Sequence, residues 1–117
     1  MRERRRHERV PFITEARIEL PAGPRLKAST TDLSEGGVGL FSPLMIAISR
    51  QVRVSFELCA EGGPYWTRPL GATVVRCQID CDGNRIALEF DQLVSDSGDQ
   101  QLAAALAHAL ARQTRVA

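Results

Sequence analysis

The stretch Val52-Arg53-Val54-Ser55-Phe56-Glu57-Leu58 decides the fold class of this chain. Apolar and polar residues alternate through it without a break, which is the period of a β-strand with one face in the core and the other in solvent. A helix would instead repeat its apolar positions every three or four residues. We therefore predict a strand over residues 52–58 within a sheet that has one buried face.

Similar stretches lie on both sides of this strand, and clusters of turn residues separate them. The further predicted strands cover residues 13–20, 26–33, 38–41, 70–77 and 85–90. The first two of these read as a hairpin. Tyr65 and Trp66 follow a Gly-Gly-Pro turn and are predicted to be packed aromatics of a loop. Short strands joined by glycine-rich and proline-rich turns are typical of a small antiparallel barrel.

The composition changes after the last predicted strand, where a segment rich in Ala and Leu begins. Leu102, Leu106 and Leu110 are four residues apart and would line one face of a helix. We predict an α-helix at about 97–114. The fold class is therefore all-β with a terminal helix: a small six-stranded antiparallel β-barrel plus a C-terminal α-helix.

The N-terminal residues differ from the rest of the chain in their charge. Residues 1–11 lack apolar periodicity and are predicted to form a flexible, arginine-rich, ligand-binding arm, with the barrel and helix in residues 12–117. The chain has a net charge of +1, and residues 1–9 alone hold five Arg and two Glu, so the arm carries +3 and the remainder −2. A basic arm on a mildly acidic body indicates a local anion site and not a broad nucleic-acid surface.

The residue sets that catalysis or metal binding requires are missing, and we predict that the protein is not an enzyme. His7 in the arm and His108 in the helix have no nucleophile at a recognisable spacing. Cys77 and Cys81 are not joined by histidines at a zinc-type spacing. The carboxylates of the 80–82 segment flank a glycine turn, where Asp is common for backbone reasons.

The longest apolar runs are far shorter than the roughly 18 residues that a membrane-spanning helix needs. The basic start of the chain is not followed by an apolar segment, so it does not read as a secretory signal. We expect a cytoplasmic protein without membrane insertion.

An Arg-x-x-x-Arg motif ends at the entrance to the first predicted strand, with Arg5 and Arg9 as its arginines. Arg2 and Arg6 have the same spacing. We prefer Arg5 and Arg9 because Arg9 leads directly through Val-Pro-Phe into the strand. Basic arms are common, so this motif alone does not indicate a ligand.

A second motif, Asp32-Leu33-Ser34-Glu35-Gly36-Gly37, lies in the turn between two predicted strands. Asp and Ser often cap turns by hydrogen bonding to nearby amides, and Gly supplies a positive φ. By itself this Asp-x-Ser-x-x-Gly pattern is also explained by turn structure.

Together, the two motifs and the barrel with its helix resemble the PilZ domain family, over nearly the whole chain. The resemblance implies a non-catalytic receptor for the second messenger cyclic di-GMP, with no other cofactor. The ligand-binding residues that it implies are Arg4, Arg5, Arg9, Asp32, Ser34, Gly36 and Gly37. Arg4 stands immediately before the motif, where an arginine in relatives accompanies an intercalated ligand dimer, so we expect two ligand molecules per chain.

The chemistry of these residue types suits that ligand. An arginine can bond phosphate oxygens in a bidentate manner, bond the O6 and N7 of guanine, or stack on a purine. The Asp32 carboxylate can accept from guanine N–H groups, and the Ser34 hydroxyl can bond either a base or its own turn.

The expected function is a cyclic di-GMP receptor or adaptor that passes its signal to an unidentified downstream protein by reordering the arm. The alternative is a ligand-independent protein-interaction module of the type IV pilus PilZ type, and the intact motifs argue against it. A nucleic-acid binder is less favoured still, because the arm lacks the interleaved aromatics that single-strand binding uses.

Overall fold

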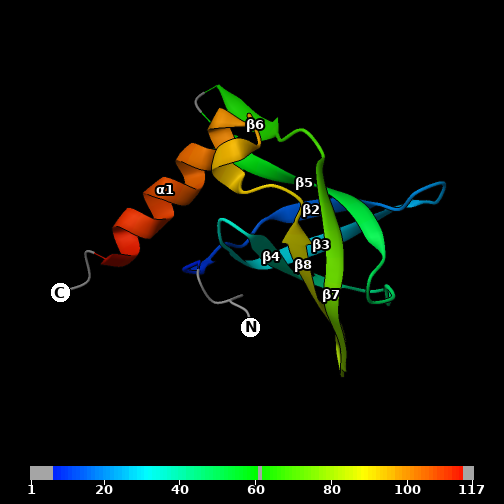
Figure 1. Ribbon diagram of the computed structural model, residues 1–117. Helices are drawn as coiled ribbons and strands as arrows, with labels where there is room; N and C mark the ends of the chain where they lie inside the picture. Colours follow the sequence, from blue (N-terminus) through cyan, green and yellow to red (C-terminus); the bar gives the residue numbers. More distant parts are fainter. Residues whose placement is uncertain (1–6, 61, 115–117) are drawn as a thin grey trace.

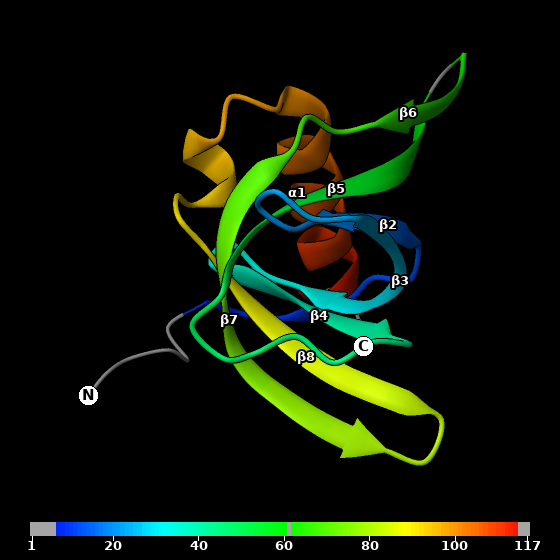
Figure 2. The same ribbon diagram turned by 90° about the vertical axis from the view of Figure 1, so that its right-hand side faces the viewer.

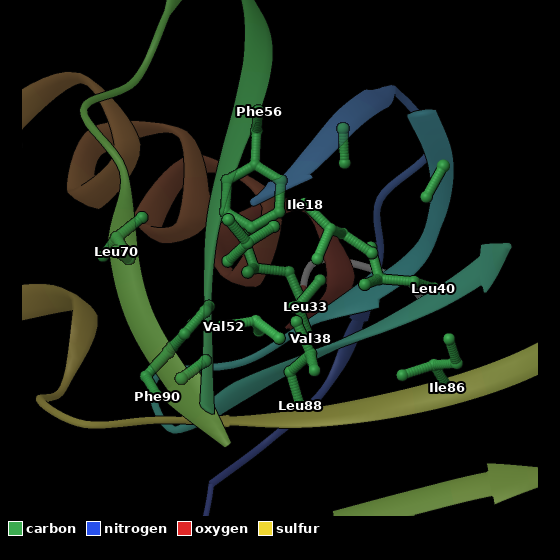
Figure 3. Close-up of a cluster of buried hydrophobic side chains, with 14 of the residues drawn as sticks. Ile18, Leu33, Val38, Leu40, Val52, Phe56, Leu70, Ile86, Leu88 and Phe90 are labelled. Carbon is green, nitrogen blue, oxygen red and sulfur yellow. The ribbon is translucent and has the colours of Figure 1, made fainter. Parts of the chain in front are cut away.

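The alternating stretch at residues 52–58 lies in strand β5 (Gln51–Ala60) of the computed structural model, which describes residues 7–60 and 62–114. Its apolar side chains are at most 7% exposed. Figure 3 shows Phe56 among the buried side chains of the neighbouring strands, and its ring meets those of Phe12 and Phe90 edge to face, with centroids 6.1 and 6.4 Å away. Burying such a side chain contributes about 1.5–3 kcal/mol, so the alternation fixes which face of β5 points inward.

The described residues contain seven more strands, a short 3-10 helix and one α-helix (Figure 1). These elements are β1 (Val10–Pro11), β2 (Glu15–Glu19), β3 (Arg25–Leu33), β4 (Gly37–Ser42), β6 (Gly63–Trp66), β7 (Leu70–Asp80), β8 (Gly83–Phe90), η2 (Val94–Asp96) and α1 (Gln100–Thr114).

Six strands close the barrel in the order β3-β2-β5-β7-β8-β4, and β4 returns to pair with β3. The pairings along this path are antiparallel. Each of the six overlaps one of the stretches that the sequence predicts as a strand, although β2 is shorter than the predicted 13–20, and the expected hairpin is β2–β3. The prediction of a six-stranded antiparallel β-barrel with a C-terminal helix is confirmed.

Strand β6 is one of two strands that the sequence does not predict. The expectation of a loop at Tyr65 and Trp66 is wrong, because these residues pair with Leu58 and Glu57 of β5. The Trp66 ring also packs against the Arg17 guanidinium, whose carbon lies 4.0 Å from the ring centroid. Figure 2 shows the β5–β6 and β7–β8 hairpins extending beyond the barrel.

Strand β1 is the second unpredicted strand, and it lies within the expected arm. Val10 is 1% exposed and pairs with β3. Thr30 of β3 fastens the segment that follows: its hydroxyl donates to the carbonyl of Phe12 at 2.5 Å and accepts from the N–H of Thr14 at 2.9 Å. The chain is thus attached to β3 from residue 10 onward. The flexibility of the arm in solution stays a prediction.

Helix α1 begins slightly later than the predicted start at about residue 97. Asp99 is its N-cap, since its Oδ1 accepts from the N–H of Leu102 at 3.0 Å. Leu102 and Leu106 are buried and Leu110 is partly buried, as their four-residue spacing predicts. Figure 1 shows that the helix starts near β6 and ends beside the N-terminal segment. Within residues 7–60 and 62–114, no helix is long and apolar enough to cross a membrane.

Candidate functional site

The loop between β3 and β4 carries the Asp-x-Ser-x-x-Gly motif, and Ser34 determines its shape. Ser34 is 4% exposed. Its hydroxyl accepts from the N–H groups of Gly36 and Gly37, each at 3.2 Å, and its own N–H donates to the Gly37 carbonyl at 2.9 Å. Of the two roles that the sequence leaves open for this hydroxyl, the structure describes the one within the turn.

Gly37 is required here by close packing of two strands. The expectation that glycine supplies a positive φ in this loop is wrong, because positive φ angles occur at other glycines and not at Gly36 or Gly37. A Cβ on Gly37 would overlap the carbonyl oxygen of Leu88 in β8. The pairing of β4 with β8 brings the two backbones this close, so a side chain at this position would push the strands apart.

Gly36 is the point at which the arm touches the motif loop. The His7 ring lies over it, and a Cβ on Gly36 would be 2.9 Å from His7 Cδ2. Next in the arm, the Oε2 of Glu8 accepts from the Nε2 of Gln113 in the last turns of α1 at 3.2 Å. The residues just before β1 therefore contact both the loop and the helix.

Arg9 and Asp32 bring the charged groups of the two motifs together. The Nη1 atom of Arg9 lies 3.3 Å from each carboxylate oxygen of Asp32. Pro11 pairs with Asp32 in the β1–β3 ladder, and this pairing brings Arg9, two residues earlier, close to the Asp32 carboxylate. The two side chains remain 52% and 33% exposed, so the pair faces solvent. Because an exposed ion pair contributes about 0–1 kcal/mol, a ligand can separate its partners at low cost.

Gly39 makes room for the Asp32 carboxylate on the outer face of the barrel. A Cβ on Gly39 would overlap Asp32 Oδ1 and would lie 2.8 Å from Thr31 Oγ1. Asp32 of β3 pairs with Gly39 of β4, directly after an irregularity in the register between Thr30 and Asp32. A glycine inside a strand often marks such a close approach.

Arg4 and Arg5 lie outside the described residues, so their predicted roles stay predictions. Arg9 contacts Asp32, and His7 lies over Gly36 of the loop that the buried Ser34 and Gly37 hold in shape. Two shallow hollows elsewhere on the barrel do not include the motif residues; one is bordered by Ile13 and Phe41, the other by Arg68 and Asp91. The candidate site is thus an open surface at the junction of the arm, β3 and the motif loop.

The carboxylate of Asp80 has a structural role, as the sequence indicates. Its Oδ1 accepts from the N–H of Cys81 at 2.8 Å and its Oδ2 from the Nε of Arg85 at 3.2 Å. The backbone bond from Cys81, followed by the bond from Arg85, holds the pKa of this carboxyl below its usual value. The three cysteines are free thiols, and in the described part of the chain no three His, Cys, Asp or Glu side chains are grouped to hold a metal ion.

Three residues in or beside the motifs were not predicted from the sequence: His7 and Gly39, described above, and Glu35, whose side chain accepts from the N–H of Ser95. Gly39 had a signal, since it is a glycine inside a predicted strand. His7 and Glu35 had none, because their contacts are with residues far along the chain.

Comparison with known proteins adds to this geometry. The family model of the PilZ domain matches residues 3–108. Among solved structures, the inhibitor of motility MotI/DgrA of Bacillus subtilis is similar with a TM-score of 0.75 and 21% identity, over 99% of this chain and 54% of that chain. The PilZ domain of YcgR from Escherichia coli, solved with c-di-GMP, has a TM-score of 0.67 and 19% identity, over 97% of this chain and 95% of that chain.

The MrkH–c-di-GMP complex of K. pneumonia is similar with a TM-score of 0.68 and 17% identity, over 98% of this chain and 55% of that chain. At such identities the likeness shows the fold. The chain spans about half the length of the MotI and MrkH chains and nearly all of the YcgR domain. No protein with a curated function matches the sequence.

Proposed function

The chain belongs to the PilZ domain family, and from this membership we propose that it is a receptor for cyclic di-GMP. Two of the structures that it resembles are complexes with that ligand. The observation that carries the proposal is the meeting of Arg9 with Asp32 on the outer face of the barrel, beside the loop that Ser34 holds. These residues come from two separate motifs, and nothing in barrel closure requires an exposed ion pair there.

The ligand offers two phosphates and two guanines to this surface. The Arg9 guanidinium can leave Asp32 to bond a phosphate, or it can bond guanine O6 and N7 as a fork. The freed Asp32 carboxylate can then accept from the N1–H and the exocyclic amine of a guanine. Adenine has neither the O6 acceptor nor the N1–H donor, so this arrangement favours guanine.

Further arginines of the arm complete the site in this proposal. Arg5 stands one motif spacing before Arg9 and would bond the phosphates from the same side. Arg4 would add a third guanidinium for a second, stacked ligand molecule. Two ligand molecules carry four negative charges, which Arg5 and Arg9 alone do not balance.

The response to the ligand would be a rearranged arm. Cyclic di-GMP that enters between Arg9 and Asp32 would displace the neighbouring contacts of His7 with Gly36 and of Glu8 with Gln113. The arm would then order around the ligand and present a new surface to a protein partner. Amide exchange of the arm, with and without ligand, measures this step, and an arm equally protected in both states would contradict it.

Calorimetric titration with cyclic di-GMP tests the proposed function, with cyclic di-AMP and GTP as controls. We expect binding of cyclic di-GMP in clear preference to both controls, because only it offers two phosphates together with two guanine edges. Equal affinity for cyclic di-AMP would contradict the proposed recognition. No binding of any of the three would favour the ligand-independent interaction module instead.

A further inference from the structure

Glu35 joins the motif loop to the segment that precedes α1, although it stands at an unspecified position of the Asp-x-Ser-x-x-Gly pattern. Its Oε1 accepts from the N–H of Ser95 at 3.0 Å, and its carbonyl accepts from the N–H of Val94 at 2.9 Å. The carbonyl of the next residue, Gly36, accepts from the N–H of Phe90 at 2.8 Å. Three hydrogen bonds from residues 90–95 thus hold this loop from one side.

The segment that holds the loop is itself firmly placed. Val94 is fully buried and begins η2. The Ser97 hydroxyl donates to the Val94 carbonyl at 2.7 Å and accepts from the N–H of Asp99 at 3.2 Å. Asp99 then caps α1. A short, continuous series of hydrogen bonds therefore runs from Glu35 to the helix, and the loop rests on a rigid support.

We propose that Glu35 is a positioning residue for the ligand: by binding Ser95, its side chain holds the loop in the conformation in which Asp32 and Gly36 meet cyclic di-GMP. The inference rests on the proposed function and deepens it. A loop that is fixed before binding loses less conformational entropy when the ligand arrives, and so the ligand binds more tightly.

Because Glu35 is negatively charged, the proposal can be tested by whether its substitution tightens or weakens ligand binding. A carboxylate near an anionic ligand weakens binding if it acts through its charge alone. Removal of the charge would then tighten binding in both Glu35→Ala and Glu35→Gln. A positioning role predicts that Glu35→Ala binds more weakly although the charge is gone. Glu35→Gln would restore binding, because its amide oxygen still accepts from Ser95.

The experiment is a calorimetric titration of cyclic di-GMP into the unsubstituted chain and three variants. We expect Glu35→Ala to bind about five-fold more weakly, which corresponds to about 1 kcal/mol. Glu35→Gln should bind at least as tightly as the unsubstituted chain. The matched control is Asp96→Asn, which removes one negative charge from η2, next to Ser95, and leaves the bond between Glu35 and Ser95 in place. This variant should bind the ligand within about two-fold of the unsubstituted chain.

Amide exchange at Ser95 in the absence of ligand supplies a second measurement. It should rise in Glu35→Ala and stay at its original rate in Glu35→Gln. The thermal midpoint of each variant separates a displaced loop from an unfolded barrel. If Glu35→Ala is poorly folded, Glu35→Leu takes its place, because it also lacks an acceptor for the N–H of Ser95 but keeps most of the side-chain volume.

Two results would overturn the inference alone: Glu35→Ala binding as tightly as the unsubstituted chain, or Glu35→Gln binding as weakly as Glu35→Ala. If the unsubstituted chain does not bind cyclic di-GMP, the proposed function fails and this inference fails with it. The titration of the unsubstituted chain therefore distinguishes the two failures.

Discussion

At the scale of one residue, substitution of Arg9 should affect ligand binding without affecting the stability of the fold. Arg9→Ala should weaken cyclic di-GMP binding by about ten- to a hundred-fold, because a charge-assisted hydrogen bond contributes roughly 1.5–3 kcal/mol. The thermal midpoint should hardly change, since Arg9 is 52% exposed and such substitutions usually alter stability by under about 0.5 kcal/mol. Calorimetry and thermal melting measure the two effects.

Arg25→Ala is the matched control for Arg9→Ala. Arg25 forms a comparable exposed ion pair with Glu19, with Nε and Oε2 3.4 Å apart, at the other end of β3. Its loss removes the same charge and should leave ligand binding unchanged. An Arg9→Ala protein that melts far below the control would contradict the assignment of Arg9 to the ligand.

The adjacent glycines of the motif should respond to substitution in opposite ways. In Gly37→Ala the new Cβ meets the backbone of Leu88, which cannot move without opening the β4–β8 ladder. Overpacking of this kind costs about 1–3 kcal/mol. In Gly36→Ala the Cβ meets the His7 side chain, which can rotate away. We expect Gly37→Ala to lower the thermal midpoint and Gly36→Ala to weaken ligand binding at nearly unchanged stability.

Thermal melting and calorimetric titration of both glycine variants check this pair. Equal loss of stability in the two would show that the His7 contact is as rigid as the strand pairing.

Sequence reasoning at this scale was most successful where a motif specifies residue types. Arg9 and Asp32 were selected by the resemblance to the PilZ family and by the position of Arg9 just before the first strand, and the structure brings the two side chains together. Sequence reasoning gave the wrong reason for Gly37, because a positive φ is a local property whereas the approach of β8 is not. The role of Glu35 depends on Ser95, and no local pattern connects those two residues.

At the scale of the element, helix α1 is joined to the barrel by its buried leucines, Leu102 and Leu106, and by the hydrogen bonds of Asp99. This residue is 6% exposed; it caps the helix, and its Oδ2 also accepts from the N–H of Arg68 at 3.3 Å and the hydroxyl of Tyr65 at 3.4 Å. Asp99→Ala should destabilise the protein by at least the 0.5–2 kcal/mol of a typical lost N-cap. Denaturant unfolding measures the change.

Two further variants show which hydrogen bonds of Asp99 account for the loss of stability in Asp99→Ala. Asp99→Asn keeps an oxygen for the cap but cannot accept at both positions, so its stability should lie between those of the alanine variant and the original chain. Asp96→Ala, on the exposed side of η2, should have little effect. An Asp99→Ala protein as stable as the original would mean that the cap does not hold the helix in place.

The elements that the sequence predicts are those with a periodic pattern of apolar side chains over several residues, which includes the four-residue spacing of α1. Strand β5 is the clearest case. The other five strands of the barrel were predicted from weaker alternation, from β-branched or Ser/Thr-rich runs and from the turn residues that separate them. Strand β1 is only two residues long and contains a proline, so it has no period to detect. Strand β6 begins with glycine and proline, which favour a turn, and only its pairing with β5 makes it a strand.

The distribution of charge over the whole molecule leads to a prediction of stoichiometry. The arm has an excess of positive charge and the remainder of the chain an excess of negative charge. A second anionic ligand should therefore bind only where arm arginines reach it. We predict two cyclic di-GMP molecules per chain, and one per chain in Arg4→Leu, where an apolar side chain occupies the stacking position. Calorimetry gives both numbers, and a value of one for the unsubstituted chain would refute the prediction.

The pairing of β4 with β8 has a consequence for how the molecule forms. The β2–β3 and β7–β8 hairpins join neighbours in the sequence and can form early, whereas β4 must meet β8 across the interval from residue 37 to residue 89. Such non-local pairing is slow and places β-rich domains among the millisecond-to-second folders. Gly37 stands at that junction, so a side chain there would oppose the non-local pairing as well as the finished barrel. Gly37→Ala should therefore slow the closing of the barrel in addition to lowering its stability.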